Sequence, residues 1–160
     1  MTSLDKARAL ALLVPTGLLA GALGSEYWGG LYPCEMCHWQ RWPHYAAVVL
    51  ALLSLLLIRM PDRGRSLVWL AALAILVSGV IGVYHAGVEA GLFEGLTQCS
   101  VVPGSGGGDP LADIMATPLI RCDQVQWSFL GISMAGWNAI ISILSGLVIL
   151  WLSLRRPKTL

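Results

Sequence analysis

The chain has 160 residues, of which 56% are hydrophobic and only 12% are charged, and its formal net charge is +1. Soluble domains usually carry about 25% charged residues, so this composition excludes an ordinary soluble globular protein. It favours a protein that lies in a lipid bilayer. We therefore expect membrane lipid as a binding partner, and no nucleic acid.

Four apolar stretches approach the roughly 20 residues that a helix needs to cross a bilayer. They cover residues 9–24, 42–58, 67–84 and 129–154. The last two contain no Asp, Glu, Lys or Arg, side chains that are costly at the bilayer centre. Irregular backbone facing lipid would leave its polar groups unpaired, so all four stretches are predicted to be helices. The expected fold is an all-α integral membrane protein, a four-transmembrane-helix bundle in one domain over residues 1–160.

Lys and Arg are distributed unevenly along the chain. Eight of the ten precede the first stretch, separate the second from the third, or follow the fourth: Lys6, Arg8, Arg59, Arg63, Arg65, Arg155, Arg156 and Lys158. Short cytoplasmic segments are enriched in these residues, so both termini are predicted to be cytoplasmic. The loops at 25–41 and 85–128 then face the outside of a multi-pass protein.

The first stretch has an alternative interpretation as a cleaved signal peptide. Lys6 and Arg8 precede an apolar run that ends in the small-residue segment Ala22-Leu23-Gly24. Cleavage would leave both outer loops outside.

The long outer loop contains a glycine-rich run at residues 103–108, where we expect the backbone to move freely. Asp109 and Pro110 then suit the start of a helix, and residues 110–117 are predicted to form a short amphipathic helix at the membrane surface. An irregular loop touching the headgroups is the alternative.

All four cysteines, Cys34, Cys37, Cys99 and Cys122, fall in the two outer loops. An even number of cysteines in an oxidising compartment indicates two disulfides, which in the simplest case are inert structural bridges. Cys34-Glu35-Met36-Cys37, however, is a C-x-x-C, whose bridge closes so small a loop that it constrains the unfolded chain little. Such a pair is typical of a redox centre that exchanges between dithiol and disulfide.

Arg41 follows Cys37 by four residues, which places both on one face if both lie in a helix. A guanidinium there could hold a thiolate or a reduced quinone oxygen. We expect Cys37 just before the second helix, because Pro43 is tolerated only near a helix start. A helix that begins after Cys37 would weaken the same-face argument, and an interfacial anchor is the alternative role for Arg41.

The second pair, Cys99 and Cys122, flanks the glycine-rich run. As a structural bridge it would contribute roughly 3 to 4 kcal/mol by restricting the unfolded chain. The glycines would also let Cys99 move towards an external partner or towards the first pair, so the two pairs are interpreted as a relay.

Cys34-x-x-Cys37-His38 also satisfies the attachment signature of a c-type haem, which would make the chain a membrane-anchored electron carrier. This alternative leaves Cys99 and Cys122 unexplained and gives Arg41 no role. A metal site that combines these cysteines with His38 or His44 is a further alternative, and we expect no metal.

The sequence resembles the disulfide bond formation protein B (DsbB) family, quinone-reducing membrane oxidoreductases with four spanning helices. The resemblance rests on Pro33-Cys34-x-x-Cys37-x-x-Gln40-Arg41 before the second stretch. It rests also on Cys122, followed by Gln126-Trp127-Ser128-Phe129-Leu130-Gly131 and Trp137 at the fourth. The His38 that follows the second cysteine and the glycine-rich run depart from the family pattern.

The resemblance implies a location in the bacterial inner membrane with a periplasmic active face, and a role in disulfide formation in exported proteins. A periplasmic thioredoxin-like oxidase (DsbA-like) would attack Cys99, with Cys122 as the resolving cysteine. Electrons would pass to Cys34 and Cys37, and Cys37 would reduce ubiquinone or menaquinone beside Arg41. His85 falls where the family has a histidine near the quinone and could bond a quinone oxygen.

Overall fold

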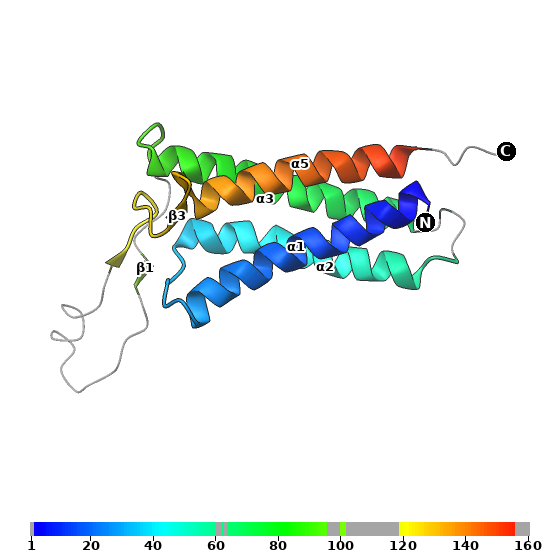
Figure 1. Cartoon of the computed structure of the whole chain (residues 1–160), viewed down its shortest axis with the longest axis horizontal. Coiled ribbons are helices and arrows are strands. Elements are labelled where there is room, and N and C mark those ends of the chain that lie inside the picture. The colour runs from blue at the N-terminus through cyan, green and yellow to red at the C-terminus, as the bar shows by residue number, and fades with distance from the viewer. Residues whose placement is uncertain (1, 60–61, 63, 96–99, 102–118, 156–160) are drawn as a thin grey trace.

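The computed structural model describes residues 2–59, 62, 64–95, 100–101 and 119–155. Within these residues the fold consists of four long helices: α1 (Ser3–Tyr27), α2 (Glu35–Leu56), α3 (Arg65–Glu89) and α5 (Met134–Leu154). The helices lie side by side, with the start of α1 and the end of α5 at one end of the bundle (Figure 1). The start of α2, which carries the C-x-x-C, lies at the opposite end.

Four short strands lie at the cysteine-bearing end (Figure 1). β1 (Ser100–Val101) pairs antiparallel with β2 (Leu119–Ile120), and β3 (Ser128–Phe129) pairs antiparallel with β4 (Ile132–Ser133). Leu130 and Gly131, which connect β3 to β4, have φ values of 54° and 77°. Positive φ at both central residues is the geometry that joins two antiparallel strands through a two-residue turn.

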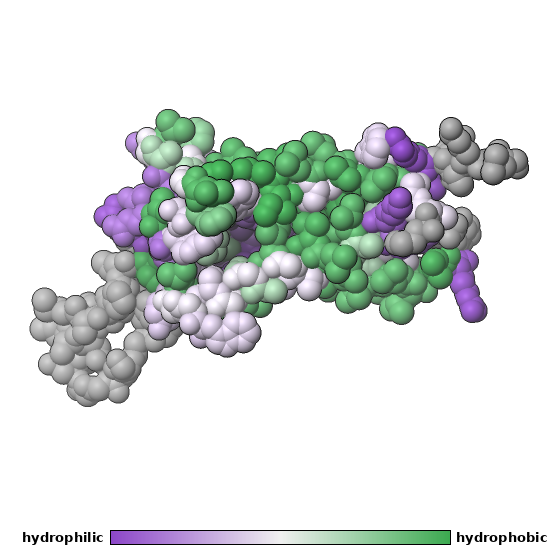
Figure 2. Space-filling model, in the orientation of Figure 1, coloured by the Kyte–Doolittle hydropathy of each residue, from purple (hydrophilic) through white to green (hydrophobic). Residues whose placement is uncertain are grey.

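The contacts between the helices are built mainly from small side chains, whereas many large apolar side chains point outwards. Fully buried positions include Ala7, Ala11, Ala47, Ala51, Ala71, Ala72, Ser54, Ser78 and Ser142. In contrast, Leu56 is 75% exposed and Val80 is 63% exposed. On the face shown in Figure 2, apolar residues cover the middle of the molecule, and hydrophilic residues lie towards its two ends. Small residues between helices and large ones outside are typical of bundles whose solvent is lipid.

Three helices are long and apolar enough to cross a membrane: Ser3–Tyr27, Arg65–Glu89 and Met134–Leu154. α2 is not among these three, because its first half carries polar residues at Glu35, His38, Gln40, Arg41 and His44. A fourth crossing by α2 therefore stays a prediction.

Several helix bounds differ from the sequence-based expectation. α1 begins at Ser3 rather than at 9, and α3 ends at Glu89 rather than at 84, so His85 lies in the helix and not in the loop. α2 begins at Glu35 rather than near residue 42, so Cys37 lies inside its first turn and Pro43 inside the helix. α5 begins at Met134 rather than at 129, because the preceding residues form the β3–β4 hairpin and Ser133 caps the helix by accepting from the Gly136 amide. The predicted surface helix at 110–117 lies outside the described residues, and so does Cys99.

Candidate redox site

The C-x-x-C occupies the first turn of α2. Cys34 is the N-cap residue, and its Sγ accepts a hydrogen bond from the Cys37 amide at 3.2 Å. The two Sγ atoms lie 2.7 Å apart, and Cys34 is buried whereas Cys37 is partly exposed. A helix N-terminus presents unpaired amides and a positive partial charge, which is a setting that stabilises thiolates.

The two thiols differ in their affinity for a proton. The pKa of Cys37 is lowered by the hydrogen bond from the Cys34 side chain, by a backbone hydrogen bond from Cys34 and by the positive charge of Arg41. The pKa of Cys34 is raised by the same side-chain bond and by burial. In the reduced pair, Cys37 therefore loses its proton more readily than Cys34.

A third cysteine lies beside this pair. Cys122 is buried in one cluster with Cys34, Met36 and Val88. In the β1–β2 ladder, Ser100 pairs with Ile120, so the two ends of the long loop meet next to the pair. The segment that contains Cys122 therefore lies beside the start of α2. The spacing of the cysteines along the sequence did not determine this contact.

Arg41 is buried on the same helix as Cys37, one turn further along, as the four-residue spacing predicted. Its Nη1 donates to the carboxylate of Glu26, and its Nη2 donates to the Ala22 carbonyl at 3.1 Å. Both acceptors belong to α1. Glu26 was not predicted to belong to the site. Its position as an acidic residue next to an apolar stretch was the available signal.

His85 approaches the cysteine pair from α3. It is 2% exposed, and its Nε2 lies 3.5 Å from Cys34 Sγ. Glu89, one turn along the same helix, places Oε1 3.9 Å from this nitrogen. His85 therefore lies beside the cysteine pair and contacts Cys34 Sγ, a contact that the sequence did not predict.

A buried polar network continues from His85 into the bundle. It consists of side chains from α2, α3 and α5: Gln40, His44, Ser78, Asn138 and Ser142. The sequence analysis gave none of them a role in electron transfer. The available signal was that polar side chains are expensive inside apolar spanning segments and commonly mark functional sites there.

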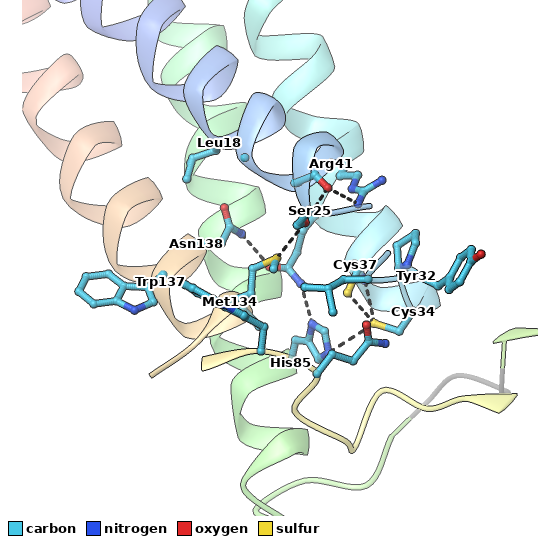
Figure 3. A pocket seen from close by; sticks show the side chains of 18 of the residues that line it. Leu18, Ser25, Tyr32, Cys34, Cys37, Arg41, His85, Met134, Trp137 and Asn138 are labelled. Atoms are coloured by element: carbon cyan, nitrogen blue, oxygen red, sulfur yellow. Dashed lines mark hydrogen bonds between the residues drawn. The ribbon is translucent and has the colours of Figure 1, made fainter. Parts of the chain in front are cut away.

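A cavity of about 670 Å³ opens beside the cysteines, between α1, α2 and α5. Cys34, Cys37, Arg41 and His85 line its polar end (Figure 3). Gly17, Leu18 and Gly21 of α1 line an apolar part. Ligand pockets commonly have about 300–1,000 Å³ and combine apolar walls with a few placed polar groups. The cavity therefore has the size and chemistry to hold a flat apolar molecule with polar oxygens, such as a quinone.

Metal and haem chemistry fit this site less well. Cys34, Cys37 and His85 place one ligand atom each within 4.8 Å of one another, as a metal site would. Gln40 Nε2, however, faces His85 Nδ1 at 2.7 Å, so the proton of a neutral imidazole lies on Nε2, where a metal would need a lone pair. The His38 side chain is exposed and outside the cavity lining, so it gives the haem interpretation no support.

The model of the family described as "Disulfide bond formation protein DsbB" matches residues 5–152. The chain belongs to this family. It is similar to the disulfide bond formation protein B of Marinobacter nauticus, at 32% identity over 92% of this chain and 90% of the relative. It is also similar to the protein of the same name from Verminephrobacter eiseniae, at 36% identity over 92% of this chain and 84% of the relative. No solved structure matches the chain.

Membership of the DsbB family makes the chain a disulfide-forming oxidoreductase of a membrane. Of the residues predicted for its site, the structure gathers Cys34, Cys37, Cys122, Arg41 and His85 at one end of the bundle. The predicted partner of Cys122, at position 99, lies outside the described residues.

Proposed function

We propose that the protein reoxidises a periplasmic thioredoxin-like dithiol oxidase (DsbA-like) and passes the electrons through two cysteine pairs to a membrane quinone, ubiquinone or menaquinone. The observation that carries the proposal is the position of Cys37. Its thiol lies between the cluster that contains Cys122 and the cavity with its apolar wall. A sulfur in that position can exchange with another sulfur on one side and with a lipid-soluble oxidant on the other.

The first steps are thiol–disulfide exchanges. A thiolate of the partner attacks Cys99 of a Cys99–Cys122 disulfide, a new S–S bond forms, and the electron pair of the broken bond stays on Cys122. The partner's second thiolate then releases Cys99 and leaves with its own disulfide. The proximity of Cys122 to Cys34 supports the next exchange, in which Cys122 attacks the Cys34–Cys37 disulfide.

Cys37 is suited to be the leaving group of that exchange. Exchange is faster when the departing thiol has a low pKa, and the pKa of Cys37 is lowered by Cys34, the backbone and Arg41. Cys122 is joined to Cys34, and the electron pair of the broken bond collects on Cys37, at the cavity wall. Cys99 then attacks Cys122, the Cys99–Cys122 disulfide reforms, and Cys34 leaves as a thiolate. Transfer of two electrons and two protons from the reduced pair to a quinone would reform the Cys34–Cys37 disulfide.

The residues around the cavity fit a quinone. When bound, a quinone supplies a two-electron acceptor that leaves as the quinol. Cys37 presents its thiolate to the cavity, and Arg41, held by Glu26 and the Ala22 carbonyl, places a fixed positive charge beside it. His85 adds a second polar group at the same end, while the apolar wall of α1 excludes water.

The charge distribution supports a periplasmic site. The cysteine-bearing end lies opposite the start of α1 and the end of α5, where Lys6, Arg8 and Arg155 are found. Lys and Arg favour the cytoplasmic side, so we place both termini in the cytoplasm of a four-crossing inner-membrane protein with the thiols outside.

The test is reoxidation of a reduced DsbA-like protein by the purified protein with a short-chain ubiquinone or menaquinone. We expect turnover in the wild type and none in Cys37→Ser, because serine cannot carry the electron pair to the cavity. His38→Ala is the matched control, an exposed neighbour that should keep full turnover. Unchanged turnover in a folded Cys37→Ser protein would contradict the proposal.

A further inference from the structure

Two amides, one buried and one partly buried, connect α5 to the cysteine pair through His85. Asn138 of α5 donates from Nδ2 to Gln40 Oε1 at 2.7 Å, and Gln40 Nε2 lies 2.7 Å from His85 Nδ1. His85 Nε2 in turn lies 3.5 Å from Cys34 Sγ. We call Asn138 and Gln40 the amide chain. Three helices contribute to this series of contacts, so its geometry is set by tertiary packing.

Backbone carbonyls fix the orientation of both amides. Asn138 Nδ2 lies 3.3 Å from the Ser78 carbonyl, and Gln40 Nε2 lies 3.3 Å from the Met36 carbonyl. A carbonyl only accepts, so the NH₂ group of each amide must face it. Rotating either amide by half a turn would set two oxygens against each other in a buried site, which costs the full desolvation of an unpaired group.

The hydrogen bonds at the far end of the amide chain, around Asn138 Oδ1, run in the same direction. Ser142 Oγ donates to Asn138 Oδ1 at 3.1 Å, and His44 Nε2 lies 2.9 Å from that oxygen. An amide oxygen has no proton to give, so His44 carries its proton on Nε2 and donates. Asn138 is therefore held from both sides, with its oxygen towards two donors and its NH₂ group towards three acceptors.

The amide chain decides the tautomer of His85. Gln40 donates to Nδ1, so Nδ1 carries the lone pair, and the single proton of the neutral ring lies on Nε2. Within the described residues, two side chains place an acceptor near Nε2: Cys34 Sγ at 3.5 Å and Glu89 Oε1 at 3.9 Å. The Cys122 backbone is a further hydrogen-bond partner of the ring. Of the two side-chain acceptors, the sulfur lies nearer.

We propose that Asn138 and Gln40 are positioning residues that hold His85 as the Nε2–H tautomer, so that His85 donates a hydrogen bond to Cys34 Sγ when that sulfur carries negative charge. The inference rests on the proposed function, in which Cys34 joins and leaves a disulfide. When a bond from Cys34 to another sulfur breaks, the electron pair stays on Cys34 Sγ, and the Nε2–H group stabilises it. No proton leaves His85, since a neutral ring that lost it would become an anion.

A consequence follows for the rate at which Cys34 leaves a disulfide. A hydrogen bond to the sulfur as it becomes charged stabilises the transition state of that exchange, so it makes Cys34 a better leaving group. The ionisable groups around Cys34 are Cys37 and Arg41 of α2, His85 and Glu89 of α3, and Cys122 of the following loop. None of these is altered by a substitution at Asn138.

The first test reads the tautomer itself. In the wild-type protein labelled with ¹⁵N-histidine, without quinone or partner, the resonances of His85 are assigned by their loss in His85→Asn. We expect a protonated Nε2 and an unprotonated Nδ1. In Asn138→Leu, which removes the donor to Gln40, both tautomers should appear. A protonated Nδ1 in the wild type, in either the other tautomer or the cation, would overturn the proposal.

The second test measures, in quinone-free protein, the rate at which dithiothreitol releases Cys34 from a mixed disulfide with glutathione, formed in a Cys37→Ser background. Dithiothreitol attacks the glutathione sulfur, and Cys34 is the leaving group. A hydrogen bond to a charged group contributes about 1.5–3 kcal/mol, so adding Asn138→Leu or Gln40→Met should slow the release about tenfold. Ser142→Ala, which touches only the oxygen side of Asn138, should leave the rate unchanged. An equal slowing in Ser142→Ala, or none in both folded test variants, would refute the role. Because neither test involves quinone turnover, the result is separable from failure of the proposed function.

Discussion

Glycine is used in opposite ways at the α3–α5 contact and on the cavity face of α1. A Cβ added at Gly79 of α3 would come within 2.8 Å of Ile143 Cγ1 and 3.2 Å of its amide nitrogen. A Cβ added at Gly17 or Gly21 of α1 would meet nothing within 4 Å. The first glycine lets two helices approach closely, whereas the other two leave space for a molecule that is not protein. Composition alone does not separate these uses, although one stabilises the bundle and the other creates a site.

The largest effect is expected at the α3–α5 contact. Gly79→Val should lower the free energy of unfolding by about 1–3 kcal/mol, because the added side chain overpacks an interface in which a side-chain atom and the backbone nitrogen of Ile143 both lie close. The measurement is the thermal unfolding midpoint in detergent. An unchanged midpoint would mean that the two helices are less closely packed than the distance to Ile143 indicates.

The same substitution in the cavity should affect binding instead. Gly17→Val should keep the unfolding midpoint but raise the KM for quinone by about tenfold, corresponding to about 1.4 kcal/mol of lost binding. Steady-state kinetics at saturating reduced partner measure this value. Equal KM values for Gly17→Val and wild type would place the quinone elsewhere.

A smaller effect concerns the polar end of the cavity. Because the pKa of Cys37 lies below its ordinary value of 9.0, the rate of its alkylation should reach half its maximum below that pH, with Cys34 reacting only at higher pH. Arg41→Gln removes one of the charges that lower the pKa, so the Cys37 midpoint should move up. Mass spectrometry of iodoacetamide-treated, reduced protein over a pH series distinguishes the two thiols.

The smallest shift is expected from Glu26→Gln, and it should have the opposite sign. Glu26 partly neutralises Arg41, so its loss leaves a stronger positive charge beside Cys37 and lowers the midpoint of alkylation. A midpoint that moved up in both variants would mean that Glu26 acts by holding Arg41 in place and not through its charge.

Local patterns predicted much of the site. The C-x-x-C, the four-residue spacing to Arg41 and the helical character of all four long segments follow from neighbouring residues, because helix periodicity relates positions three and four apart. The start of α2 was predicted too late because Pro43 was taken to mark the first turn, whereas capping by Cys34 begins the helix at Glu35. The hairpin before α5 was missed because its apolar residues also suit a spanning segment.

The sequence by itself determined that this chain belongs in a membrane, where its thiols lie along the chain and that two of them form a C-x-x-C. Each of these properties depends on composition or on short-range spacing. Only the tertiary structure decided that Glu26 pairs with Arg41, that Asn138 and Gln40 orient His85, and that Cys122 lies beside Cys34. Those contacts join residues from different helices and a distant loop, and their geometry arises from how small side chains let the helices pack.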